Sequence, residues 1–346
     1  MRIGDFRASY RHDESLWPTR VQRGWLATLA LALAAFPLAA NGYVVGLACL
    51  VGIHCIAAAG LNIMTGYTGL ISLGHAAFLG VGCYTAAWFA QRGFPFFLTL
   101  PLAGLVAAAI GLVVGLPSLR IKGLYLAVAT LATQFLLVYV FREWDEVTGG
   151  VRGVNVPNAS LFGFELRDDH RMYTLIVPVA ALMLVGARNL FRTRVGRAFI
   201  AIRDKDISAE VLGIDLLHYK LAAFALGSFY AGVAGALLGY FYRAMTPEYF
   251  TLQLSVFYLA AIIVGGLGSM LGTILGAVFM TLVPELLRGG VAWVATWAPG
   301  ATEVLSPMQQ VVFGLLIMGF LVFEPHGLLE IWRRVRRLFH LWPFRA

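Results

Sequence analysis

Charged residues are scarce in this sequence. Asp, Glu, Lys and Arg make up 13% of its 346 residues, whereas soluble domains carry roughly 25%. Hydrophobic residues make up 60%, and the mean hydropathy is +0.78. Because long uncharged runs recur along the chain, we exclude an ordinary soluble domain and predict an all-α polytopic integral membrane protein.

Cysteine is also rare. Cys49, Cys55 and Cys83 all lie inside apolar runs, and no two of them form a Cys-x-x-Cys pair. We interpret them as small buried hydrophobic residues, which say nothing about the redox compartment. The seven histidines do not show the His-Glu-x-x-His spacing of a zinc site, so we predict no metal centre.

The sequence lacks an ATP-binding loop of the common kind. A P-loop needs glycine, lysine and then serine or threonine in succession, and none of the lysines here follows a glycine. No apolar run carries a charged residue near its middle, which argues against coupling to protons or sodium ions. We therefore expect no cofactor in this chain; if ATP powers it, separate subunits bind the ATP.

About ten apolar runs are expected to cross the membrane as helices. The first follows several arginines and resembles a signal peptide in outline, but because many further runs follow, we expect a retained transmembrane helix. The approximate bounds are 24–40, 42–63, 76–91, 96–116, 124–141, 172–190, 219–241, 252–266, 268–287 and 307–323.

Small residues recur at every fourth position in two of these runs. Such ridges let helices approach closely in lipid, so we predict tight helix packing along both. The ridges are Gly227, Ala231, Gly235 and Gly239, and Gly268, Gly272 and Gly276.

The basic residues are unevenly distributed. Most of the 26 Lys and Arg residues fall in segments that ten spans place on one side of the membrane, including 1–23, the loop 191–218 and 331–346. The positive-inside rule then puts both termini in the cytoplasm, with a transmembrane domain over 24–330. This placement suits contact with lipid headgroups and not with nucleic acid. The tail 331–346 has an apolar helical face and predicts a basic amphipathic helix in the inner headgroup layer.

One uncharged but polar stretch, 62–75, joins the second and third runs. Each glycine weakens a helix by about 1 kcal/mol relative to alanine, and three occur here, so we predict a broken helix. Irregular backbone at membrane depth is tolerated where it is buried in protein or lines a wet cavity. We therefore predict that the stretch lines a solute pathway. The candidate residues are Asn62, Thr65, Gly66, Tyr67, Thr68, Gly69, Ser72 and His75.

A zwitterion with an aliphatic tail suits such a lining, because helix N-termini bind its carboxylate and carbonyls bind its ammonium group. The alternative is a glycine hinge whose polar groups only cap helix ends. His75 fits the start of a helix better than a proton relay. Gln134, with Thr130 and Thr133 in the fifth run, is a further candidate for the same cavity.

Two long loops are candidates for partner contacts. The outer loop 142–171, with Thr148 and turn glycines, is either a solvated loop or a surface for an external binding protein. The inner loop 191–218 is amphipathic and is either an interfacial helix or a coupling helix that docks in a groove of a cytosolic ATPase. The coupling candidates are Ser208, Ala209, Glu210, Gly213 and Ile214.

The stretch 60–87, GLNIMTGYTGLISLGHAAFLGVGCYTAA, resembles the signature of LivM/LivH-type permeases, and the whole chain looks LivM-like. These are subunits of ABC importers for branched-chain amino acids in the bacterial inner membrane. Segment 208–214 is similar to the EAA-type loop of such permeases, although Ile207 and Ser208 stand where Glu and Ala are usual. The resemblance implies a type II-like ten-helix fold that works by alternating access. Its implied partners are a second, LivH-like permease, two cytosolic ATP-binding subunits and an extracytoplasmic solute-binding protein.

Other functions remain open at this point. A similar permease for urea, short amides or small organic acids differs only in a few cavity side chains. An ATP-independent channel or facilitator is a different class, and the large amphipathic inner loop fits the importer better. We expect no enzyme, because the sequence shows no nucleophile–base pair or metal cluster.

Overall fold

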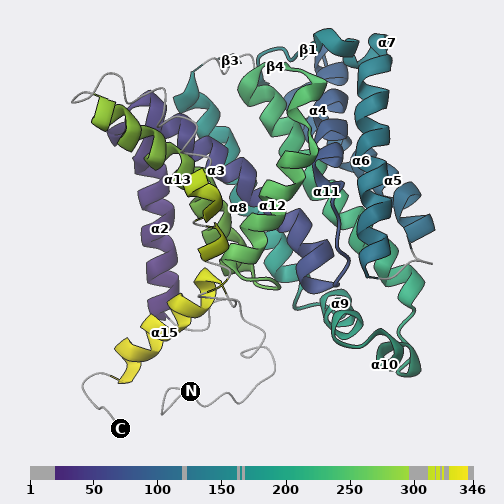
Figure 1. Ribbon diagram of the computed structural model, residues 1–346. Helices are drawn as coiled ribbons and strands as arrows, with labels where there is room; N and C mark the ends of the chain where they lie inside the picture. The colour runs from purple at the N-terminus through teal and green to yellow at the C-terminus, as the bar shows by residue number, and fades with distance from the viewer. Residues whose placement is uncertain are drawn as a thin grey trace.

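The computed structural model describes residues 20–118, 123–161, 164–165, 168–295, 311–315, 317–319, 322 and 327–341. Most of segment 1–23 therefore lies outside the described residues, as do residues 307–310, 316, 320, 321 and 323 of the predicted span 307–323 and the last residues of the tail. The described chain forms a helical bundle (Figure 1).

Apart from α9 and α15, which lie in the loop 191–218 and around the start of the tail 331–346, the longer helices follow the predicted apolar runs to within a few residues at most ends. They are α2 (Arg20–Ala39), α3 (Gly42–Leu61), α4 (His75–Gln91), α5 (Phe96–Ser118), α6 (Leu124–Glu143), α8 (Asp169–Leu190), α9 (Arg194–Asp204), α11 (Leu216–Tyr242), α12 (Leu252–Gly265), α13 (Met270–Ala295) and α15 (Leu328–Leu341). The short helical elements are the π-helix η1 (Asn62–Tyr67), α7 (Asp145–Thr148), η2 (Gly150–Arg152), α10 (Asp206–Val211) and η3 (Pro247–Tyr249).

Seven helical segments of the described chain are long and apolar enough to cross a membrane. They are Gly42–Tyr67, Phe96–Pro117, Tyr125–Glu143, Asp169–Leu190, Leu216–Tyr242, Pro247–Gly265 and Met270–Gly290. The prediction of an all-α polytopic membrane protein is thereby confirmed, while the count of about ten spans stays a prediction. In α2 the apolar part, Gly24–Ala39, is shorter, and α4 has 17 residues.

Helix α11 lies at the centre of the packing, against α3, α4 and α5. Its predicted glycine ridge is where the backbones meet. A Cβ atom at Gly60 of α3 would lie 2.7 Å from the carbonyl oxygen of the ridge residue Gly227, and the ridge residue Gly235 packs directly on the Leu79 backbone of α4. Beside the ridge, Gly232 packs directly on Gly82 of α4. Without water, apolar side chains gain little by leaving lipid, so close backbone packing of this kind is what holds membrane helices together.

The loop 142–171, predicted to be an outer loop, is tied to the chain after α11. Strand β1 (Val154–Asn155) pairs antiparallel with β4 (Ala244–Met245), and Val156 N–H donates to the Arg243 carbonyl at 2.7 Å. Thr148 is buried and donates to the Phe141 carbonyl at 2.6 Å. A second pair joins β2 (Ser160–Leu161) to β3 (Phe164–Glu165). The described part of this loop is therefore held to the bundle at Thr148 and at residues 154–156.

The bundle has two distinct ends. Helices α9, α10 and α15 lie at one end, and α7, β1 and β4 lie at the other (Figure 1). The segment leading into α15 is anchored by close packing, because a Cβ at Gly327 would lie 2.7 Å from the Gly266 amide nitrogen. Gly327 has φ +75°, which suits glycine.

The packing of α4 on α11 gives a stability prediction. In Gly82→Ala the new methyl group meets the Gly232 backbone, so we expect a loss of about 1–3 kcal/mol from overpacking. The matched control is Gly289→Ala in α13, where a Cβ meets nothing within 4 Å. Thermal unfolding in detergent measures both; equal melting temperatures for the two variants would contradict the packing role of Gly82.

Candidate functional site

The predicted break between the second and third runs is present. Helix α3 runs on into the π-helix η1, and residues 68–74 then form no regular helix before α4 begins at His75. π-Helices are rare in proteins, and those that occur are often found at functional sites. Regular helix therefore ends at Tyr67, six residues into the stretch 62–75, and not at its first polar residue, Asn62.

The first turn of α4 lies inside the bundle, where its free N–H groups need partners. Ala76 N–H donates to Ser255 Oγ and Ala77 N–H donates to Gln134 Oε1, both at 2.9 Å. Gln134 also donates from Nε2 to the Phe250 carbonyl at 2.7 Å. Gln134, predicted as a cavity residue, is therefore a buried bridge between α4, α6 and the chain before α12.

Asn62 connects the π-helix to the turn between α12 and α13. Its Oδ1 accepts from Gly268 N–H at 3.0 Å, and its Nδ2 donates to Thr273 Oγ1 at 2.7 Å and to the Ser269 carbonyl at 3.3 Å. The side chain is fully buried. Asn62 uses its donors and its acceptor to hold two distant segments together and does not face an open cavity.

The two threonines of the segment bond within it. Thr65 donates to the Leu70 carbonyl at 3.0 Å, and Thr68 donates to the Ile63 carbonyl at 2.9 Å. The Tyr67 ring stacks on Phe191. These contacts stabilise the irregular backbone from inside, as the hinge alternative requires.

Ser72 and His75 are completely buried. His75 Nε2 contacts the Ala57 carbonyl at 2.8 Å and so connects α4 to α3. Among the described residues, Ser72 Oγ and His75 Nδ1 have no hydrogen-bond partner. His75 is the first residue of α4, as expected of a helix-start residue.

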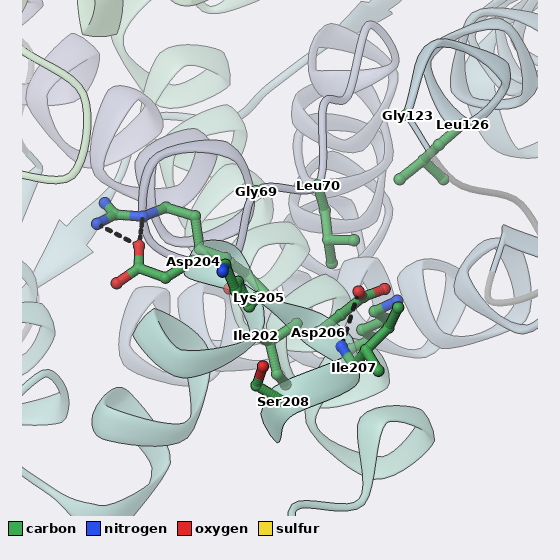
Figure 2. Close-up of a pocket in the computed structure, with 13 residues that line it drawn as sticks. Gly69, Leu70, Gly123, Leu126, Ile202, Asp204, Lys205, Asp206, Ile207 and Ser208 are labelled. Atoms are coloured by element: carbon green, nitrogen blue, oxygen red, sulfur yellow. Dashed lines mark hydrogen bonds and ion pairs between the residues drawn. The ribbon is translucent and has the colours of Figure 1, made fainter. Parts of the chain in front are cut away.

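A cavity of about 560 Å³ lies where the broken segment meets α9 and α10 (Figure 2). Of the eight predicted pathway residues, Thr68 and Gly69 line it. The start of α6 and the end of α9 complete its wall. Its lining consists of Thr68, Gly69, Leu70, Gly123, Leu126, residues 202–208 and Lys220.

Charged residues line the cavity, although the predicted lining, 62–75, is uncharged. The run Arg203, Asp204, Lys205, Asp206 joins α9 to α10 and lines one wall, and Lys220 of α11 lines another. The unbroken charge run in the sequence is the signal that points to these residues. Ser255, the helix-capping hydroxyl, carries no comparable signal, because only the fold brings α12 beside the start of α4.

The predicted coupling residues lie at the α9–α10 end of the bundle. Ser208, Glu210 and Gly213 are exposed, whereas Ala209 is buried and Ile214 is partly buried. Gly213 has φ +84° and closes α10, donating from N–H to the Glu210 carbonyl at 2.9 Å. Beside them are three exposed apolar side chains, Ile207, Val211 and Leu212, with 69%, 82% and 80% exposure.

Comparison with known proteins places this architecture. The profile of a family described as "Branched-chain amino acid transport system / permease component" matches residues 43–321. The chain belongs to this family. The permease is 30% identical over 337 residues to the high-affinity branched-chain amino acid transport system permease protein LivM of Escherichia coli K12, covering 90% of this chain and 76% of the relative. Against LivM of Salmonella typhimurium the identity is 31% with the same coverage.

More distant relatives include both permease types. The probable LivH of Methanocaldococcus jannaschii is 25% identical over 295 residues, which cover 81% of this permease and 90% of that protein. No solved structure matches the chain. The resemblance to LivM/LivH-type permeases is thereby confirmed.

The role of Asn62 gives a second prediction. In Asn62→Ala the buried Gly268 N–H loses its acceptor, and we expect a loss of about 1–3 kcal/mol of stability. Asn189→Ala on the exposed face of α8 is the control and should change stability by less than about 0.5 kcal/mol. Thermal unfolding in detergent compares them, and an Asn62 variant as stable as the control would refute the bridging role.

Proposed function

We propose that this permease is the transmembrane subunit of an ABC importer that moves branched-chain amino acids into the cell by alternating access. The observation that carries the proposal is the 30–31% identity to two LivM proteins along nearly the whole chain. Those relatives are named for high-affinity transport of branched-chain amino acids. The chain itself performs no covalent chemistry; it carries leucine, isoleucine or valine across the membrane.

The importer needs further subunits. Relatives of both the LivM and LivH types match this chain, which supports pairing with a second, LivH-like permease. Two cytosolic ATP-binding subunits supply the energy, and an extracytoplasmic solute-binding protein delivers the amino acid. In this arrangement ATP is bound by the partners and not by this chain.

The α9–α10 segment is the surface we assign to the ATPase. Aliphatic side chains that are exposed on a short helix beyond the bundle are costly in water and gain by docking in a groove. The patch consists of Ile207, Val211 and Leu212. Ser208, Glu210 and Gly213 are exposed beside it, and Ala209 is buried beneath the surface. At the opposite end, α7 and the β1–β4 pair form a firm surface for the binding protein.

The orientation follows from the same assignment. We place α9, α10 and α15 in the cytoplasm of a bacterium and the β1–β4 end outside the inner membrane, so that both termini are cytoplasmic. The basic residues of the inner loops support this orientation. The segments 1–23, 24–330 and 331–346 remain the proposed basic start, permease domain and surface helix.

Within 62–75 we divide the roles. Thr68 and Gly69 border the cavity and are the proposed contacts with the moving solute. Asn62, Thr65, Gly66, Tyr67, Ser72 and His75 lie in the hydrogen-bonded and packed frame that lets the segment keep its irregular shape. Broken helices of this kind border the solute in other transporters.

Reconstitution tests the function. The proteoliposomes hold this permease, the LivH-like subunit and both ATPases, and the binding protein is added to the assay. They should take up radiolabelled leucine only with ATP. Unlabelled isoleucine and valine should compete, whereas urea and acetamide should not. Leucine flux through this chain alone would favour a channel, and ATP-driven uptake of urea without leucine would favour the alternative solute.

The docking patch gives a separate prediction. The double variant Val211→Asp and Leu212→Asp should weaken binding of the ATPase at least tenfold without loss of thermal stability, because both side chains are exposed. The control is Val151→Asp, a 65% exposed valine at the opposite end of the bundle. Co-purification on the tagged ATPase measures the effect; equal recovery of both variants would exclude the patch.

A further inference from the structure

Arg203, near the end of α9, does not remain at the surface of the inner helices. Its Nη1 donates to the Gly66 carbonyl of the π-helix at 2.9 Å. The side chain is 37% exposed, so one side faces water and the other enters the bundle. The last carbonyls of a helix lack partners within the helix, and a cation at that end is favourable. An arginine from another segment thus completes the end of the broken helix.

The same guanidinium touches a second segment. A Cβ at Gly268, in the turn between α12 and α13, would lie 2.5 Å from Arg203 Nη1. Gly268 is also the residue whose N–H donates to Asn62 Oδ1. Arg203, the π-helix and the α12–α13 turn therefore meet at one point.

Asp204 fixes the direction of the guanidinium. Its Oδ1 accepts from Arg203 Nε and from Nη2, each at 3.1 Å (Figure 2). Because the guanidinium is planar, holding one edge directs the remaining nitrogen, Nη1, toward Gly66. The approach needs glycine on the facing segments: Gly69 has φ +76°, and a Cβ there would lie 3.3 Å from Arg203 Cγ.

We propose that Arg203 is the positioning residue that transmits movement of the α9–α10 segment to the broken segment and to the α12–α13 turn. This inference rests on the proposed function, in which the ATPase acts on α9–α10. A displacement of α9 moves the guanidinium, and the guanidinium carries the Gly66 carbonyl and the Gly268 turn with it. Asn62 then keeps those two moving together.

The matched pair for the test is Arg203→Gln and Arg197→Gln. Arg197 lies on the same helix and is exposed, but its Nη1 donates to the Arg192 carbonyl of its own segment. In the complete reconstituted importer, Arg203→Gln should keep ATPase binding and hydrolysis within about twofold and lower leucine uptake at least tenfold. Arg203→Lys should restore part of the uptake, because lysine keeps a charged donor but lacks the fork that Asp204 holds. Arg197→Gln should match the parent protein.

The proposal would be overturned if Arg203→Gln left the ratio of leucine transported to ATP hydrolysed unchanged. It would also be overturned if Arg197→Gln lowered leucine uptake as much as Arg203→Gln does. If Arg203→Gln does not fold, hydrogen exchange on the complex with Arg203→Lys decides. ATP binding should alter exchange in α9, 66–70 and 266–270 of the parent, and in the variant the change at 66–70 and 266–270 should be smaller while that in α9 is kept. A response at 66–70 as large as the parent's would refute the linkage. Failure of the parent importer to couple ATP to uptake would instead refute the proposed function.

Discussion

Backbone at membrane depth finds no water, so every N–H and C=O outside a helix needs a partner within the protein. The break after α3 and the α12–α13 turn both contain such groups, and side chains from other segments satisfy them. Asn62 bonds to the α12–α13 turn, Thr130 accepts from Leu73 N–H at 2.9 Å, and Gln134 and Ser255 cap α4. The arrangement of α4, α6, α12 and α13 around the break follows from this requirement.

Glycine makes the arrangement possible in a second way. The helices that carry the capping side chains must approach the break closely, and at Gly74 a Cβ would lie 2.6 Å from the Thr130 carbonyl oxygen of α6. Gly60 against Gly227 and Gly82 against Gly232 likewise permit close packing of α3 and α4 on α11. A larger residue at Gly74 would therefore disturb the contact of the break with α6.

The break lies between the buried hydrogen-bonded frame and the charged cavity at the α9–α10 end of the bundle. One side of it is tied to α12–α13 through Asn62, and the other meets α9 through Arg203. Such a segment is fixed in shape but joined to parts that lie at the surface. This is the physical basis for our proposal that 62–75 responds to displacement of α9–α10.

The sequence alone determined the membrane class, the positions of the apolar helices and the break at 62–75, because hydrophobicity and glycine content act locally. It also identified Gly227 and Gly235 as a packing ridge, since their spacing of eight residues puts them on one helical face. Only the tertiary structure decided what the polar groups bond to. The partners of Asn62 lie more than two hundred residues away, and the sequence does not specify which hydroxyl will meet which N–H. For the same reason the sequence does not distinguish Arg203 from the other basic residues of 191–218. Only the fold shows that its guanidinium lies beside Gly66 and Gly268.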